Sequence, residues 1–137
     1  MRCACVAACN HLGENHEDNS NRELIEEISE SLSQIGMETV IVARDFEKWG
    51  EKKITARELM GFALENIEKS DLLLIEFSEK GVGLGIEAGY AFAKGIPIVV
   101  IAKQGTDISK SMEGLTKEVV FYNVVEELQE KLKKYII

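Results

Sequence analysis

The sequence predicts an α/β protein with a doubly wound, Rossmann-like or flavodoxin-like fold, in which helices flank a five-stranded parallel sheet. Three observations predict it. Short apolar, β-branched runs alternate along the chain with longer segments of helical periodicity. The central run, DLLLIEF at 71–77, is apolar without alternation, which is typical of a strand covered by helices on both faces. The length of 137 residues, without repeats or an evident linker, predicts one domain over 1–137.

The first half of the chain is expected to supply two strands and two helices. Residues 2–9 read as a short buried strand, and 38–43 as a β-branched second strand. Between them, apolar residues repeat at helical spacing over 22–34. A second helix ends near Ser70 and begins after the sequence TARE at 55–58, which has the form of a capping box.

The second half continues the alternation after the 71–77 strand. A glycine-rich loop, GVGLGIEAGYA at 81–91, leads into a helix that ends at Lys94-Gly95. Residues 97–102 and 118–122 are expected to be strands. Residues 123–134 are expected to form a closing amphipathic helix with Val124, Leu128 and Leu132 facing inward. The order of elements indicates a parallel sheet built from βαβ units.

Charge and composition exclude several classes of function. The formal net charge of −8 argues against binding a nucleic-acid polymer, which requires clustered Lys and Arg. No apolar run approaches the roughly 20 residues that span a membrane. The N-terminus is too short for a signal peptide, so a cytoplasmic location is expected.

Three cysteines, Cys3, Cys5 and Cys9, crowd the first nine residues. Cys3 and Cys5 would share one face of the first strand and could in principle hold a metal. No second pair of ligands follows elsewhere, so we interpret the cysteines as small buried side chains of that strand. Neither a metal nor an organic cofactor is predicted.

A ligand site is expected beyond the carboxyl ends of the strands, where doubly wound folds bind their ligands. Asn10 and His11 follow the first strand, Asp45 follows the second, and Ser78 follows the third. The glycine-rich loop and the segment from Gln104 to Gly114 complete this edge of the sheet.

The glycine-rich loop matches G-x-G-x-x-A after a strand, the dinucleotide-binding fingerprint. Two features count against that interpretation. The loop follows the third strand instead of the first, and Glu87 would place a negative charge where a pyrophosphate should rest. A carboxylate in the first turn of a helix is favoured as the anion, so we expect Glu87 to stay ionised. The surrounding glycines would then allow a ligand to approach the backbone closely.

The segments SD at 70–71, GVGLGIEAGYA at 81–91 and KGIPI at 94–98 resemble the signature of the nucleoside 2-deoxyribosyltransferase superfamily, which includes 2′-deoxynucleoside 5′-monophosphate N-glycosidases. The similarity runs over roughly residues 64–128. It implies that Glu87, between Gly85 and Gly89, is the nucleophile that attacks the sugar C1′. It also implies a homodimer or higher homo-oligomer with shared sites, and a nucleoside or nucleotide as the small-molecule substrate.

The same resemblance suggests residues that bind the substrate. A serine before Met and Gly contacts the 5′-phosphate in the monophosphate hydrolases, often from a neighbouring subunit. Either Ser109 or Ser111 can match it here. Ser78 and the backbone of the glycine loop are further phosphate candidates, and Tyr90 or Trp49 can flank the base. The candidate loop glycines are Gly81, Gly83 and Gly85.

Two departures from the family pattern leave the activity open. The family carries an Asp eight residues before Asp71, where this chain has Ala63, and Ala8-Cys9-Asn10-His11 replaces a Gly-Ser loop. Asn10, His11 or Asp45 can supply a substitute polar group. Losing a general acid costs about 10²- to 10⁴-fold in rate. The first hypothesis is an N-glycosidase or deoxyribosyltransferase with Glu87 as nucleophile, and the second is a non-catalytic nucleotide-binding domain of the same fold.

Overall fold

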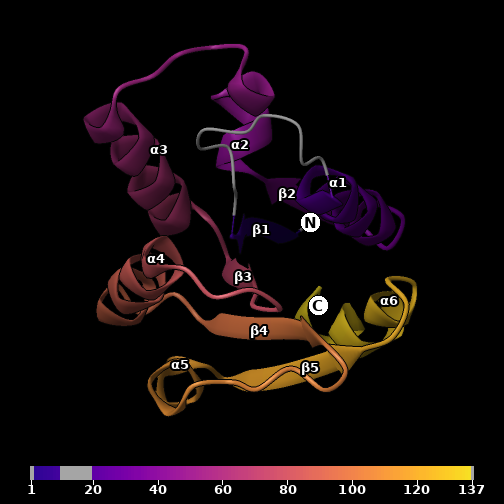
Figure 1. The fold of residues 1–137 in the computed structure, drawn as a ribbon. Helices are drawn as coiled ribbons and strands as arrows, with labels where there is room; N and C mark the ends of the chain where they lie inside the picture. The colour runs from indigo at the N-terminus through magenta and orange to yellow at the C-terminus, as the bar shows by residue number, and fades with distance from the viewer. Residues whose placement is uncertain (1, 10–19, 137) are drawn as a thin grey trace.

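A five-stranded parallel sheet forms the centre of the molecule (Figure 1). The computed structural model describes residues 2–9 and 20–136. The strands lie in the order β2-β1-β3-β4-β5, which is the flavodoxin-like order. This confirms the predicted fold class. The strands are β1 (Arg2–Ala8), β2 (Met37–Val40), β3 (Leu72–Glu76), β4 (Ile98–Lys103) and β5 (Glu118–Tyr122).

Helices cover both faces of the sheet (Figure 1). On β3, Leu72 and Leu74 pack into one core, and Leu73 and Ile75 into the other, which explains why this strand is apolar throughout. One face carries α1 (Ser20–Ser33), α6 (Glu127–Leu132) and the 3-10 turn η2 (Lys133–Tyr135). The other face carries α3 (Ala56–Lys69), α4 (Val82–Ala93) and α5 (Lys110–Leu115).

Helix α3 begins at the predicted capping box, and two later elements differ from prediction. The Thr55 side chain accepts the Glu58 N–H, and the Glu58 carboxylate accepts the Thr55 N–H. The short helix α5 was expected as a loop, but Ser109 caps it. The closing helix is shorter than predicted, and Val124, expected to face inward, is 56% exposed.

Strand β2 ends earlier than the sequence predicts. The β-branched run suggested a strand through Ala43, but β2 stops at Val40 and the chain turns into α2 (Val42–Asp45). Asp45, the last residue of α2, explains this early end. The Asp45 carboxylate accepts the Ile41 N–H at 2.9 Å, which holds the start of α2 in place of a strand hydrogen bond. A 3-10 turn, η1 (Lys48–Gly50), follows before α3.

This early end leaves part of β1 open on one side. The pairing of β1 with β2 runs only as far as Cys5 and Val40. The next three residues, Val6–Ala8, still pair with β3 on their other side. The connection that follows β1 leads to β2 on one side, and the connection that follows β3 leads to β4 on the other, so the topological switch point of the sheet lies between β1 and β3.

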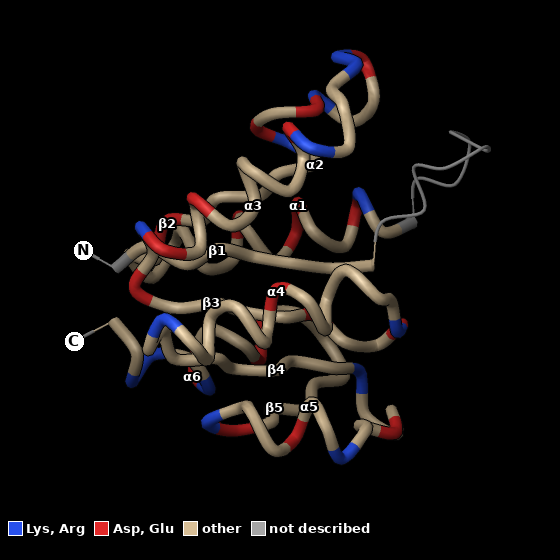
Figure 2. Tube along the Cα trace, turned by 90° about the vertical axis from the view of Figure 1, so that its left-hand side faces the viewer, with Lys and Arg blue, Asp and Glu red and all other residues tan. Residues whose placement is uncertain are grey.

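Charged residues of both signs are mixed along the chain. Figure 2 shows Lys and Arg interspersed with Asp and Glu, most visibly in the connection from α2 to α3. Among the helices that the structure describes, none combines the length and apolarity needed to cross a membrane.

Candidate active site

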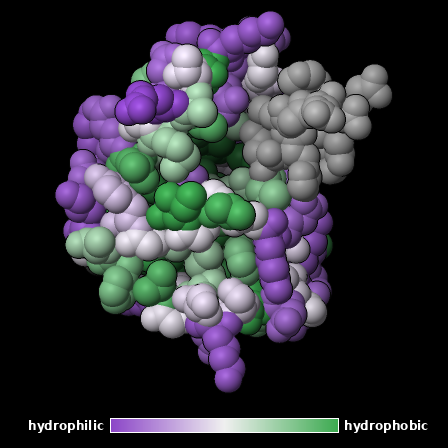
Figure 3. Space-filling model, turned by 60° about the vertical axis from the view of Figure 1, so that its left-hand side comes forward, coloured by the Kyte–Doolittle hydropathy of each residue, from purple (hydrophilic) through white to green (hydrophobic). Residues whose placement is uncertain are grey.

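A cavity of about 380 Å³ opens at the switch point beside the uncovered part of β1. It is bounded by β1, by the segment from Ile41 to Glu47, by α3 and by the first turns of α4. The space-filling view shows a hollow with hydrophobic surface around it on this side of the molecule (Figure 3). The volume suits a small organic ligand. Among the residues that the structure describes, three side chains in its lining can ionise, those of Cys5, Glu47 and Glu87.

Helix α4 carries Glu87 to this cavity, and the helix begins earlier than predicted. Gly81 is its N-cap, so the expected glycine loop forms the first two turns of the helix. Glycine lowers helix propensity without forbidding helix, and the burial of Leu84, Ala88 and Ala91 outweighs that cost. A Cβ at Gly83 would meet no atom within 4 Å. Packing within this chain therefore does not require glycine there, whereas space for a ligand would.

The environment of Glu87 corrects the expectation that its carboxyl stays ionised. Because α4 starts at Val82, Glu87 lies in the second turn, beyond the strongest influence of the helix N-terminus. Its side chain is half-buried, and burial raises its pKa from an ordinary 4.5 to about 7. The protonated and ionised forms are therefore both well populated at neutral pH.

A second carboxyl, that of Glu47, lines the same cavity and was not predicted from the sequence. Glu47 lies between α2 and η1, it is half-buried, and burial raises its pKa. In the sequence it is one of several charges in RDFEKWGEKK. The signal that distinguishes it is the turn into α2, which decides which of these side chains faces the cavity.

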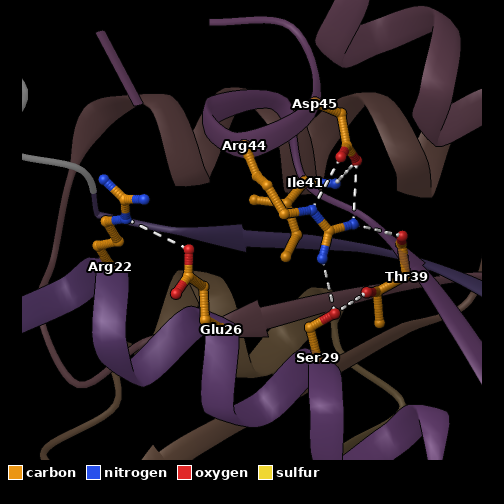
Figure 4. A network of polar contacts seen from close by, with 7 residues as sticks. All are labelled: Arg22, Glu26, Ser29, Thr39, Ile41, Arg44 and Asp45. Atoms are coloured by element: carbon orange, nitrogen blue, oxygen red, sulfur yellow. Dashed lines mark hydrogen bonds and ion pairs between the residues drawn. The ribbon is translucent and has the colours of Figure 1, made fainter. Parts of the chain in front are cut away.

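The side chains of Arg44 and Asp45 hold α2 against its neighbours (Figure 4). The Arg44 guanidinium donates to Asp45 at 2.8 Å, to the Ser29 hydroxyl at 2.8 Å and to the Thr39 carbonyl at 2.9 Å. Burial alone would raise the pKa of Asp45, but the hydrogen bonds from Arg44 and the Ile41 N–H outweigh it and lower that pKa. Asp45, predicted to bind substrate, is thus engaged in fixing α2.

Three other residues that were predicted to bind substrate also have structural partners. Ser78 donates its hydroxyl to Glu76 at 2.9 Å and accepts the Lys103 N–H at 2.9 Å, joining the ends of β3 and β4. It lines a separate cavity of about 30 Å³. The Tyr90 hydroxyl donates to Glu68 of α3 at 2.6 Å, and Trp49 lies under the Arg22 guanidinium.

The two candidate phosphate serines lie in a different cavity from Glu87. Ser109 and Ser111 line a largely apolar pocket of about 470 Å³, together with Gly81 and Gly85. The Ser109 hydroxyl also accepts the Met112 N–H as the N-cap of α5. Of the three predicted loop glycines, Gly83 alone lines the Glu87 cavity.

The remaining predictions concern the first strand and its loop. Asn10 and His11 lie outside the described residues. Cys5 is buried in β1 as expected, and its pKa rises to about 12 because of burial and the nearby Glu87 charge. In the part of the chain that the structure describes, no three His, Cys, Asp or Glu side chains are grouped to hold a metal ion.

Ala63 lines the Glu87 cavity from α3 and is 4% exposed. The position at which the family pattern has an Asp thus faces the same space as Glu87. Here it contributes only a methyl group, so the cavity has a hydrophobic wall where that carboxyl would stand.

Comparison with known proteins supports the resemblance drawn from the sequence. No protein-family model matches the chain. A curated protein of Thermofilum pendens (strain DSM 2475 / Hrk 5), whose name describes a predicted 2′-deoxynucleoside 5′-phosphate N-hydrolase, is 32% identical over 87 residues. This match covers 60% of the chain and spans 61% of the relative's length.

Two solved structures share the fold over nearly the full chain. The CMP N-glycosidase of Clostridium botulinum has a TM-score of 0.70 at 19% identity, covering 98% of this chain and 99% of its own. A 2-deoxyribosyltransferase of Bacillus psychrosaccharolyticus has a TM-score of 0.68 at 12% identity, covering 93% and 90%. In sequence over the matched segment, and in fold over almost its whole length, the chain resembles proteins of the nucleoside 2-deoxyribosyltransferase superfamily, which confirms that prediction.

Proposed function

We propose that this chain cleaves the N-glycosidic bond of a nucleoside 5′-monophosphate, or of a nucleoside, with Glu87 as the nucleophile. The observation that carries the proposal is the placement of the Glu87 carboxyl in a cavity of about 380 Å³ at the switch point of the sheet. The named activities of the relatives described above point to the same chemistry.

The reaction follows from a carboxylate facing a sugar. Ionised Glu87 attacks C1′ and the bond from C1′ to the base nitrogen breaks. The result is a glycosyl ester on Glu87, which water resolves in hydrolysis or a second base resolves in transfer. Two displacements at one carbon retain its configuration, as in retaining glycosidases. The apolar walls keep bulk water from the ester, and the same burial raises the pKa of Glu87 to about 7.

A panel of nucleosides and 5′-monophosphates, assayed for released base by chromatography, tests the activity. Glu87→Gln should abolish release, whereas Glu51→Gln, at an exposed position, should leave it unchanged. Because only the ionised carboxylate attacks, kcat/KM should rise with pH up to about 7. A 2-fluoro sugar analogue should leave a covalent adduct on Glu87 that mass spectrometry locates. Release that survives Glu87→Gln would refute this mechanism.

The active form is proposed to be a homodimer or higher homo-oligomer. Within one chain, Ser109 and Ser111 line a different cavity from Glu87, so a phosphate contact from them requires a second copy. Val82, which lines that second cavity, is 82% exposed, and Ile86 on the same helix is 51% exposed. Their burial against another copy would remove hydrophobic surface from water.

A second candidate function is nucleotide binding without chemistry, and Ala63 is the observation that favours it. A cavity with a methyl group in place of the family acid can bind a nucleotide yet fail to expel the base. Calorimetry that detects binding of a monophosphate, with no base released from any member of the panel, would establish this alternative.

A further inference from the structure

The proposed reaction needs a proton for the departing base, and this inference rests on that reaction. An ordinary purine or pyrimidine leaves far more readily when a general acid protonates it. Ala63 cannot supply a proton. Besides Glu87, the ionisable side chains among residues 2–9 and 20–136 that line the cavity are those of Cys5 and Glu47. With a pKa of about 12, the Cys5 thiol is too weak an acid for this task near neutrality, so Glu47 is the candidate acid among the described residues.

Glu47 lines the same cavity as Ala63, the position of the family acid. The rings of Phe46 and Phe62 stack with centroids 4.4 Å apart, joining the end of α2 to α3. The residue that follows each ring, Glu47 and Ala63, lines the Glu87 cavity. The cavity therefore lacks a carboxyl at Ala63 on α3 but has one at Glu47, on the segment that follows α2.

The backbone around Glu47 is fixed while its carboxyl remains available. The Glu47 N–H donates to the Val42 carbonyl at 3.1 Å, and the Glu47 carbonyl accepts the N–H groups of Gly50 and Lys52, each at 3.0 Å. The Arg44 network anchors α2 immediately before it. Within residues 2–9 and 20–136, the Glu47 carboxyl has no hydrogen bond or ion pair. A half-buried carboxyl without a partner is typical of a functional group.

We propose that Glu47 is the proton donor to the leaving base, replacing the acid that this chain lacks at Ala63. In the first step, the Glu87 carboxylate forms a bond to C1′ while the C1′–N bond breaks, and the Glu47 proton goes to the departing nitrogen. In the second, the Glu47 carboxylate takes a proton from water, the water oxygen attacks C1′, and the ester bond to Glu87 breaks. One water is consumed, and one base and one sugar are released.

In the reactive state the two carboxyls share one proton. This proton is on Glu47, and Glu87 is ionised. Burial raises the pKa of Glu87 to about 7 and also raises that of Glu47, so at mildly acidic to neutral pH the two carboxyls share one proton, and the fraction of molecules with this proton on Glu47 is the one that reacts. Loss of the remaining proton at higher pH removes the acid. The pH profile of kcat/KM for an ordinary base should therefore be bell-shaped, with apparent pKa values that belong to the pair.

The test compares two leaving groups in the purified protein. 2′-Deoxyguanosine 5′-monophosphate needs a proton on its base, whereas its 7-methyl derivative carries a positive charge and releases a neutral base without one. Glu47→Gln should lower kcat/KM for the ordinary base by about 10²- to 10⁴-fold, and for the methylated base by less than about tenfold. It should also remove the fall in rate at alkaline pH.

Three controls separate the possible failures. Glu51→Gln should leave both rates unchanged, Glu87→Gln should abolish both, and thermal unfolding should show that Glu47→Gln remains folded. Equal losses on the two substrates, or no loss on either, would overturn the role of Glu47 while leaving the proposed function intact. Absence of release by the unmodified protein from these two substrates and from every member of the nucleoside and monophosphate panel would overturn both.

Discussion

At the scale of single residues, the protonation of Glu87 governs the proposed chemistry. Its pKa of about 7 reflects burial beside apolar side chains, against which the helix N-terminus has little effect from one turn away. The glycine-rich loop, together with its resemblance to the superfamily signature, singled out Glu87 from the sequence. It could not indicate the protonation state, because that depends on side chains from β1, α2 and α3 that meet only in the fold.

The buried carboxyl should also make stability depend on pH. The unfolded chain releases the Glu87 proton near pH 4.5 and the folded chain near pH 7, so stability is lost as pH rises through this window. Glu87→Gln removes the effect. The variant should match the parent below pH 4.5 and exceed its free energy of unfolding by about 3 kcal/mol at pH 8.

Urea denaturation at pH 4, 6 and 8 measures this difference. Glu51→Gln, which changes an exposed carboxyl, should show no comparable trend. A difference between Glu87→Gln and the parent that is constant over the three pH values would show that Glu87 is not the buried acid described above.

At the scale of elements, the beginnings of α2 and α4 decide the shape of the cavity. The sequence predicted most elements because their apolar periodicity is strong. It was wrong at both of these boundaries, where local preferences conflict with longer-range contacts. Glycines suggested a loop at α4, and β-branched residues suggested a longer β2. Tertiary burial decided the first boundary and the Asp45 hydrogen bond decided the second. Glu47 was missed because the direction of its side chain depends on where β2 ends and α2 begins.

Replacing a glycine in each of two helices distinguishes an effect on stability from an effect on the space available to a ligand. Gly83→Ala and Gly61→Ala both add a methyl group that meets no atom within 4 Å. Each should raise the free energy of unfolding by about 0.5–1 kcal/mol. Since only Gly83 lines the cavity, Gly83→Ala alone should lower kcat/KM, by about 10- to 200-fold. Urea titration and the base-release assay measure the two effects, and equal activities would argue against glycine as clearance for substrate.

The anchor of α2 can be tested in the same way. Arg44→Met removes hydrogen bonds to Asp45, Ser29 and Thr39 and should cost about 1–3 kcal/mol of stability. Arg57→Met, at an exposed position on α3, should change stability by less than about 0.5 kcal/mol. Similar losses from the two variants in chemical denaturation would mean that the Arg44 network does not hold α2.

At the scale of the whole molecule, the sheet order places the Glu87 cavity and the serine pocket on opposite sides of the start of α4. The sequence predicted the fold class and the edge of the sheet at which the Glu87 cavity lies, since both follow from the alternation of strands and helices. It could not show that Glu87 and the serines occupy separate cavities, because this depends on the direction of each side chain around one helix.

Mixed oligomers test whether two chains share one site. Glu87→Gln and Ser111→Ala should each be impaired on a monophosphate substrate at low concentration. Co-expressed in equal amounts, half of the dimers combine one chain of each kind and contain one intact site. The mixture should recover about a quarter of the parent activity. Activity no greater than the average of the two separate variants would show that each chain contains a complete site.

The open side of β1 has a consequence for how a base would be recognised. Opposite β3, the main chain of Val6–Ala8 faces the cavity where β2 has ended. An uncovered strand edge presents N–H and C=O groups in a fixed pattern, and such a pattern can read the donors and acceptors of a base. Substituting side chains leaves these groups in place. Selectivity for the base can therefore persist through alanine scanning of β1, and replacing a backbone amide by an ester would be needed to reveal it.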